Sequence, residues 1–187
     1  MKKYFFAFAI ISVISNSSYS QALMPWQGPN GKWGFMDERF NNLIIDCKYD
    51  LAYGFTEGLA AVCYEKKWGF INKNDSVVIP FKYEEPIEHF FDGIAKVTLN
   101  RKTGFIDKTD KVVIPIKYDH ASGFAIKSSS IDKEYSMVGI DGKWGYIDKT
   151  GKEIVPIKYT HDKAMLKFEK YIEKQLKVEV EQLLWRL

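Results

Sequence analysis

Three histidines, His89, His120 and His161, are the residues best suited to acid–base or metal chemistry near neutral pH. His120 and His161 each follow a tyrosine by two residues and lie beside an aspartate, Asp119 or Asp162. Such a pair could bind a metal, but two histidines fall short of a zinc ligand set. We therefore expect solvated loop histidines, with no metal and no cofactor.

The sequence has no motif for a known class of catalysis. It has no glycine-rich phosphate loop, no nucleophile elbow and no His-Glu-x-x-His motif of zinc proteases. We expect a protein that is not an enzyme. The alternative is a hydrolase of envelope polymers that uses a pair of Asp or Glu side chains, which a one-dimensional sequence does not reveal.

Two cysteines, Cys47 and Cys63, could form a disulfide in an exported chain. In the repeat described below, Cys47 is equivalent to apolar residues that are each followed by a lysine, namely Phe81, Ile116 and Ile157. Because neighbouring residues of a strand point to opposite faces, Cys47 is predicted to face inward. Cys63 lies on the face that corresponds to Lys96, so it is predicted to face outward. Side chains on opposite faces of a sheet rarely meet, and the register therefore disfavours a disulfide.

The N-terminus has the pattern of a secretory signal peptide. Lys2 and Lys3 precede an apolar stretch at 4–14, and small residues at 18–20 suit a signal peptidase. We expect residues 1–20 to be removed and the mature protein to be periplasmic or secreted, since the stretch is short for a bilayer span. A retained N-terminal anchor is the alternative.

The mature chain is close to neutral. Loss of Lys2 and Lys3 reduces the 27 basic residues to 25, against 24 acidic residues. This balance gives no electrostatic case for nucleic acid binding. After signal removal, no other segment is long and apolar enough to span a membrane.

The elements that must position these residues are copies of one repeated sequence. Trp33, Trp68 and Thr103 lie 35 residues apart. The fourth copy begins at Trp144, 41 residues further on, and its six extra residues are most simply placed at 128–134. A fixed period of this length predicts a tandem repeat architecture.

Each copy predicts short β-strands. The copy begins with an alternating Trp-Gly-Phe-Ile-Asp strand, then has a turn such as 148–151, and a Val-Val-Ile strand leads into Pro-x-Lys-Tyr. A third strand is predicted at 59–62 and 94–97. The proline predicts an edge or an end of its strand, and the glycine after Trp predicts a close backbone approach or a bulge.

The pattern Lys-Trp-Gly-Phe-Ile-Asp-Lys-Thr-Gly-Lys-x-Val-Ile-Pro-x-Lys-Tyr-Asp resembles the WG repeat, also called the KWG repeat, of bacterial proteins. The resemblance covers Gly31 to about Asp162, with departures at Thr103 and at Asp46-Cys47. It implies a mainly β tandem array of about four three-stranded units, no catalytic residues, and a role as a binding module. The expected repeat domain is 21–162, with units near 31–65, 66–100, 101–141 and 142–162.

After Tyr159 the apolar residues are spaced by three or four. They are Met165, Phe168, Ile172, Leu176, Val180, Leu183 and Leu187. This spacing predicts an amphipathic helix at 163–187, with Asp162 as its N-cap. We expect the helix to cover the open end of the last repeat, because repeat arrays need caps. The alternative is a partner or homodimer contact, which the apolar segment 183–185 favours.

Side chains in register across the copies suggest two surfaces. Lysine stripes would attract an anionic polymer or, as we favour, protect strand edges from unwanted pairing. The lysines are Lys32, Lys67, Lys102 and Lys143 in one column, and Lys48, Lys82, Lys117 and Lys158 in the other. The tryptophans could stack on sugars, but apolar residues in register favour a stacked core.

Residues that break the repeat are the better binding candidates, because function collects on variable loops of a rigid scaffold. They are Trp26, Tyr53, Phe91 and Tyr135, together with the inserted segment 128–134. The sequence thus predicts an exported, non-catalytic repeat protein that binds a protein or glycan partner of the cell envelope. An assembly element that dimerises through 163–187 is the structural alternative.

Overall fold

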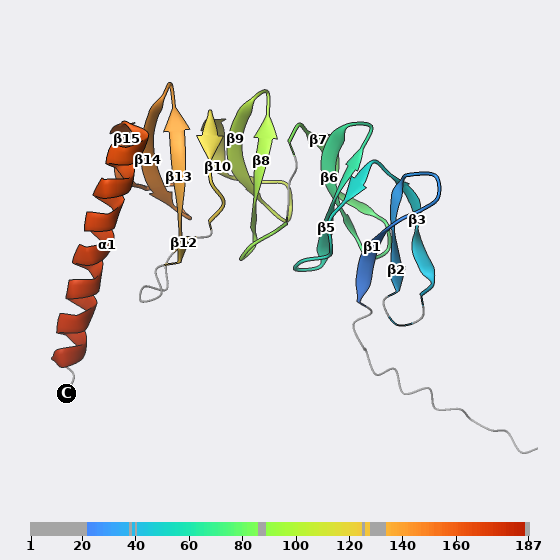
Figure 1. Ribbon diagram of the computed structural model, residues 1–187, viewed down its shortest axis with the longest axis horizontal. Helices are drawn as coiled ribbons and strands as arrows, with labels where there is room; N and C mark the ends of the chain where they lie inside the picture. The colour runs from blue at the N-terminus through green and yellow to red at the C-terminus, as the bar shows by residue number, and fades with distance from the viewer. Residues whose placement is uncertain are drawn as a thin grey trace, which may run out of the picture.

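The computed structural model describes residues 22–37, 39, 41–85, 89–124, 126–127 and 134–185. The expected signal peptide at 1–20 and all but the last residue of the insertion at 128–134 lie outside them. The described residues form four small antiparallel sheets and one helix, which confirms the mainly β repeat array with a C-terminal helix. The sheets follow one another along an arch, with the helix at one end (Figure 1).

Each sheet is built around a strand that begins at or just before the repeated tryptophan or Thr103. The first sheet comprises β1 (Leu23–Gln27), β2 (Trp33–Asp37) and β3 (Leu43–Tyr49). The second comprises β4 (Leu51–Ala52), β5 (Leu59–Tyr64), β6 (Lys67–Asn72) and β7 (Val77–Tyr83). The third comprises β8 (Ile94–Leu99), β9 (Lys102–Asp107) and β10 (Val112–Tyr118). The fourth comprises β11 (His120–Ala121), β12 (Ile126–Lys127), β13 (Glu134–Ile140), β14 (Lys143–Asp148) and β15 (Glu153–Tyr159).

The sheets do not coincide with the sequence repeats. Strand β5, which the sequence places at the end of the first repeat, pairs along its whole length with β6 of the second. The two strands are joined by Glu65 and Lys66, whose φ angles of 50° and 62° are those of a tight hairpin turn. The same kind of turn joins β8 to β9 and β13 to β14. Asp141-Gly142 between β13 and β14 is a hairpin signature, but Glu65-Lys66 and Asn100-Arg101 are not, so the sequence alone does not assign this grouping to every sheet.

The glycine after each tryptophan faces a bulge in the outer strand. In the second sheet the register shifts between Trp68 and Phe70, and β7 bulges toward Gly69. A Cβ on Gly69 would lie only 2.5 Å from the carbonyl oxygen of Ile79. The close approach expected from the sequence is therefore present. Pro80 lies in this bulge on an edge strand, where the missing N–H interrupts no ladder.

Stacking of the sheets buries both faces of those inside the array. A phenylalanine from the segment that follows each of the first three sheets packs on the aromatic residue of that sheet's central strand. The ring pairs are Phe55 on Phe35, Phe90 on Phe70 and Phe124 on Phe105, with centroids 4.6 to 4.8 Å apart. Each sheet is thus closed by the chain that leads into the next one.

Helix α1 (His161–Leu184) supplies this contact for the fourth sheet. Phe168 stacks on Tyr146 with centroids 4.0 Å apart, and Ala164 is buried beside it. The helix begins at His161, so Asp162 is not its N-cap. Asp162 lies in the first turn instead, where a carboxylate interacts favourably with the helix dipole.

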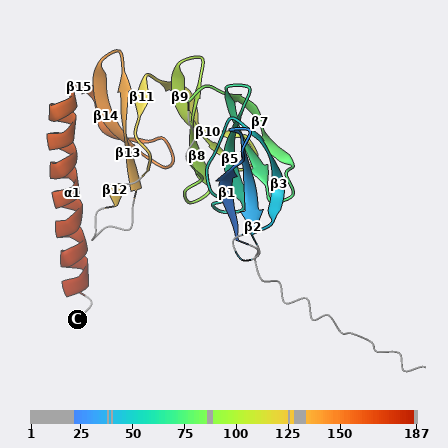
Figure 2. The same cartoon turned by 45° about the vertical axis from the view of Figure 1, so that its right-hand side comes forward.

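The C-terminal half of α1 extends past the fourth sheet, as Figures 1 and 2 both show. Val178, Val180 and Leu184 in this half are exposed, as is Trp185 directly after the helix. Charged residues interrupt this segment throughout. No helix among the described residues has both the length and the apolarity that a bilayer span needs.

One of the two cysteines differs from its expected orientation. Cys63 is 5% exposed and lies in the core between the second and third sheets, so the prediction that it faces outward is wrong. Strand β5 is buried on both faces, and strand alternation therefore does not separate inside from outside there. Cys47 is half-buried, and both cysteines are free thiols.

The bulge predicts that Gly69→Ala strongly destabilises the fold. The new Cβ would overlap the Ile79 carbonyl oxygen, so β6 and β7 must separate. We expect the free energy of unfolding in urea to fall by about 2–3 kcal/mol. Gly54→Ala is the control, because a Cβ there meets nothing within 4 Å, and it should cost less than about 0.5 kcal/mol. Equal losses in the two variants would contradict this role for the bulge.

Candidate functional site

Lysine and tyrosine at the end of a sheet are bound by an aspartate from a turn of the next sheet. Asp110 Oδ1 accepts a hydrogen bond from Tyr83 at 2.6 Å, and its Oδ2 accepts one from Lys82 at 2.5 Å. Burial and then this hydrogen bond raise the pKa of the Tyr83 phenol. The equivalent contact one junction earlier joins Asp75 to Lys48 and Tyr49.

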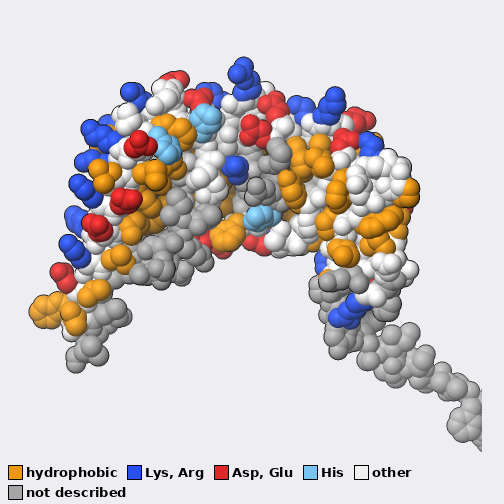
Figure 3. All heavy atoms as spheres, viewed as in Figure 1, with side chains coloured by type: hydrophobic (Ala, Val, Ile, Leu, Met, Phe, Trp, Pro, Cys, Tyr) orange, Lys and Arg blue, Asp and Glu red, His pale blue; other side chains and the backbone are white. Residues whose placement is uncertain are grey.

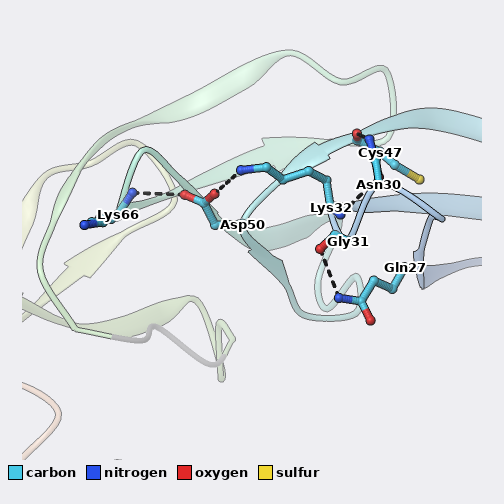
Figure 4. A network of polar contacts seen from close by, with 7 residues as sticks. All are labelled: Gln27, Asn30, Gly31, Lys32, Cys47, Asp50 and Lys66. Atoms are coloured by element: carbon cyan, nitrogen blue, oxygen red, sulfur yellow. Dashed lines mark hydrogen bonds and ion pairs between the residues drawn. The ribbon is translucent and has the colours of Figure 1, made fainter.

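A second acidic residue at each junction binds the other lysine column. Asp50 accepts hydrogen bonds from Lys32 Nζ at 2.5 Å and from the Lys66 backbone N–H at 3.0 Å (Figure 4). It therefore joins the first sheet to the hairpin turn of the second, and these two bonds lower the pKa of its carboxyl group. Glu84 and Asp119 repeat the arrangement at the next two junctions. Lys32, Lys67 and Lys102 thus bind acidic residues of the array and do not form a free cationic stripe.

The two histidines in register flank a tryptophan. His120 stacks on Trp144 with centroids 5.5 Å apart and ring planes 12° apart, and His161 meets the same ring edge-on at 5.1 Å. Within the described residues, no three His, Cys, Asp or Glu side chains are grouped to hold a metal. Trp68 is buried and Trp33 and Trp144 are half-buried, so the tryptophans belong to the cores.

The underside of the arch is hollowed, whereas basic and acidic side chains crowd its upper rim (Figure 3). Two clefts on this side are lined by residues of the connections before β5 and β8 and by Gly123 and Phe124, which precede β12. The first cleft, of about 400 Å³, is lined by residues 53–56 and His89. The second, of about 350 Å³, is lined by His89, Phe91 and Phe124 among others. His89 therefore connects the two clefts.

A third cleft, of about 830 Å³, extends this series toward α1. Phe91 lines both the second and the third cleft, and so joins them. Tyr171 of α1 and Thr150 of the β14–β15 turn lie at the far end. The three connected clefts are called the underside groove. It spans parts of three sheets and the helix, a shape that suits an extended chain.

Charged residues of the third cleft are bound to one another. Lys149 Nζ contacts Asp92 at 2.5 Å and also binds Glu134. Burial alone would lower the pKa of Lys149, but the hydrogen bonds to these carboxylates outweigh it and raise that pKa. Glycosidases keep an open space between two carboxyl groups for the sugar and water. Here the Lys149 ammonium group lies between the carboxylates of Asp92 and Glu134 and binds both.

The structure places the predicted binding residues in different settings. Tyr53 and Phe91 are 39% and 41% exposed and line the underside groove. Trp26 is also exposed, but it lies on β1 and does not line the groove. Tyr135 borders the third cleft yet is only 1% exposed, because its ring packs against α1. His89, expected to be a solvated loop residue, is the link between Tyr53 and Phe91.

Sequence reasoning missed a pair of acidic residues on this side. Glu57 binds Lys108 of the next sheet at 2.9 Å, as Asp92 binds Lys149. A signal was present, because both acids precede a glycine at equivalent places in the repeat, Glu57-Gly58 and Asp92-Gly93. Each lysine is likewise the second residue of an Asp-Lys-Thr turn. The pairing itself joins residues 51 and 57 positions apart, which no local pattern predicts.

Four consecutive segments of the chain match the family described as "WG containing repeat", at residues 33–68, 68–102, 104–144 and 144–161. The chain belongs to the WG repeat family. A search of curated proteins finds no match. Each WG match begins within or beside the central strand of a sheet. The last strands of each of the first three matched segments therefore pair with the central strand of the following segment and belong to its sheet.

The junction acids predict a loss of stability in acid. Hydrogen bonds hold the pKa of Asp50, Glu84 and Asp119 below the ordinary values of 3.8 for Asp and 4.5 for Glu. The stabilisation is therefore complete above those values and is lost as the pH falls through the lower pKa of the folded state. We expect the free energy of unfolding to decrease between about pH 5 and pH 3.

Asp50→Asn should make this pH dependence shallower, since the amide does not ionise. Urea denaturation across the pH range measures the slope. Glu173→Gln is the matched control, because Glu173 lies exposed on α1. A slope that changes as much in the control as in Asp50→Asn would contradict the assignment.

Proposed function

We propose that this WG-repeat chain is an exported, non-catalytic binding module that holds an extended polymer, a polypeptide or a glycan, in its underside groove. The observation that carries the proposal is that three neighbouring clefts share lining residues: His89 lines the first and second, and Phe91 lines the second and third. The signal-peptide pattern at 1–20 supports a location in the periplasm or outside the cell. No cofactor is required.

The chemistry of the groove supports binding. The exposed rings of Tyr53 and Phe91 offer flat apolar surface, while Thr56, Thr150 and Lys152 offer polar groups along the same path. Binding sites commonly combine an apolar lining with a few polar groups that fix orientation. One face of the Tyr53 ring packs on Trp68, with centroids 5.4 Å apart, which holds the other face in place for a ligand.

A second candidate function is assembly through α1. Its C-terminal half lies beyond the fourth sheet and exposes Leu184 at 66% and Trp185 at 90%. Apolar side chains exposed on this scale mark interaction surfaces. We propose that two copies of the chain form a homodimer in which these helices pack against each other.

The groove proposal predicts that Tyr53→Ala combined with Phe91→Ala weakens the retention of envelope polymers. Truncation removes the two exposed rings, and we expect binding to weaken about tenfold or more. The measurement uses immobilised residues 21–187 with separate polysaccharide and protein fractions of envelope extract. Trp185→Ala is the control, because it removes an exposed aromatic ring outside the groove. Full retention by the double variant in both fractions would contradict the proposal.

The assembly proposal predicts a change of mass when Val180 and Leu184 are both replaced by lysine. Charged groups at these exposed positions would oppose apolar packing between two helices, so a dimer should become a monomer. Light scattering over a range of concentrations measures the mass. Leu51→Lys is the control, since Leu51 is 48% exposed on β4. A wild-type protein that stays monomeric at every concentration would exclude assembly.

A further inference from the structure

One junction lacks the aspartate that closes the other two. Asp75 and Asp110 bind the Lys-Tyr pairs of the preceding sheets from a turn position with φ of 60° and 67°. In the fourth sheet Gly151 occupies this position, with a φ of 81°. The Lys-Tyr pair at the equivalent place in the preceding sheet is Lys117 and Tyr118, on β10, the strand whose Ile114 lies next to Gly151.

The two donors keep the arrangement seen at the occupied junctions. Lys117 Nζ lies 5.3 Å from the centre of the Tyr118 ring, against 5.3 and 5.1 Å in the pairs that bind an aspartate. Among the described residues, Lys117 has no ion pair. The pose is therefore set by packing on the tyrosine and does not need a carboxylate.

The junction has room for a side chain at residue 151. A Cβ built on Gly151 meets Ile114 at 3.6 Å, an ordinary van der Waals contact. Lys117 is exposed and Gly151 is half-buried, so solvent reaches the rim of this space, while Tyr118 forms its buried floor.

We propose that Lys117 and Tyr118 form a carboxylate-binding site at the junction between the third and fourth sheets. One carboxylate oxygen accepts the Tyr118 hydroxyl and the other accepts Lys117 Nζ, as the two oxygens of Asp110 do with Tyr83 and Lys82. The ligand is a small organic acid or the side chain of an Asp or Glu in another molecule. This site does not depend on the underside groove.

Two further charged groups border the site. Burial raises the pKa of Tyr118, and the negative charge of Glu153 adds to the effect, so Glu153 is near the phenol. The Glu153 carboxylate accepts the backbone N–H of Ile157 at 3.3 Å, which directs it to its own strand. Lys152, beside Gly151, adds positive charge at the rim. The Glu153 carboxylate could therefore compete with a bound carboxylate for the Tyr118 hydroxyl, and one variant in the experiment tests this.

The test compares thermal unfolding in sodium acetate and in sodium chloride at equal ionic strength. We expect acetate to raise the wild-type midpoint by about 2 °C more than chloride does. Gly151→Asp supplies the carboxylate within the chain. Gly151→Asn carries the same backbone strain at a φ of 81° without the charge, so the midpoint of Gly151→Asp in chloride should exceed that of Gly151→Asn. The acetate-specific rise of Gly151→Asp should disappear. An acetate effect of equal size in wild type and Gly151→Asp overturns the proposal.

Asp110→Gly is the reciprocal variant. It creates the same site at the preceding junction, and acetate should restore part of the stability that it loses. If this variant does not fold, the shift of the Gly151 amide resonance of wild type in an acetate titration decides the question. No shift of that resonance, with none in Tyr118, overturns the proposal.

Two further arms identify the competitor and the source of the carboxylate. Glu153→Gln should strengthen the acetate response about twofold or more if Glu153 partly occupies the donors, and leave it unchanged otherwise. Acetyl-aspartate amide is compared with acetate in the same titration. Tighter binding of the former assigns the site to a peptide carboxylate, and equal binding assigns it to small organic acids; binding of neither overturns the proposal.

Discussion

The array depends on the contact between the aromatic residue of each central strand and a phenylalanine from the chain that follows. Each sheet belongs to a repeat of about 35 residues, which is too short to build a sufficient hydrophobic core by itself. Phe55, Phe90 and Phe124 cover the first three sheets, and Phe168 of α1 covers the last. The helix is thus a cap in a physical sense, because it supplies the ring that a further repeat would otherwise provide.

The same constraint explains the polar residues that the repeats share. Because the sheets must lie face to face, each turn approaches the end of the preceding sheet, where Asp75 and Asp110 bind a lysine and a tyrosine. The glycine after Trp lets the bulged outer strand approach, and this bulge carries the Lys-Tyr pair. Five lysines that look like part of a binding stripe in the sequence therefore join the sheets to one another: Lys32, Lys48, Lys67, Lys82 and Lys102.

Binding potential lies where the repeats differ. The upper rim repeats the same turns and ion pairs at each junction, so it offers one pattern several times over. The underside is built by connections of unequal length and composition, which bring Tyr53, His89 and Phe91 into one groove. A regular scaffold with variable connections on one side is a common arrangement for recognition by repeat proteins.

The sequence by itself determined the repeat period, the strands, the glycine at the bulge and the C-terminal helix, because these depend on local spacing and backbone preference. Only the tertiary structure decided which strands share a sheet, why Cys63 is buried, which acids bind the lysines, and that His89 joins Tyr53 to Phe91. Periodicity reports the two faces of one strand, whereas burial and pairing are set by the neighbouring sheet. That neighbour contributes residues tens of positions away in the chain.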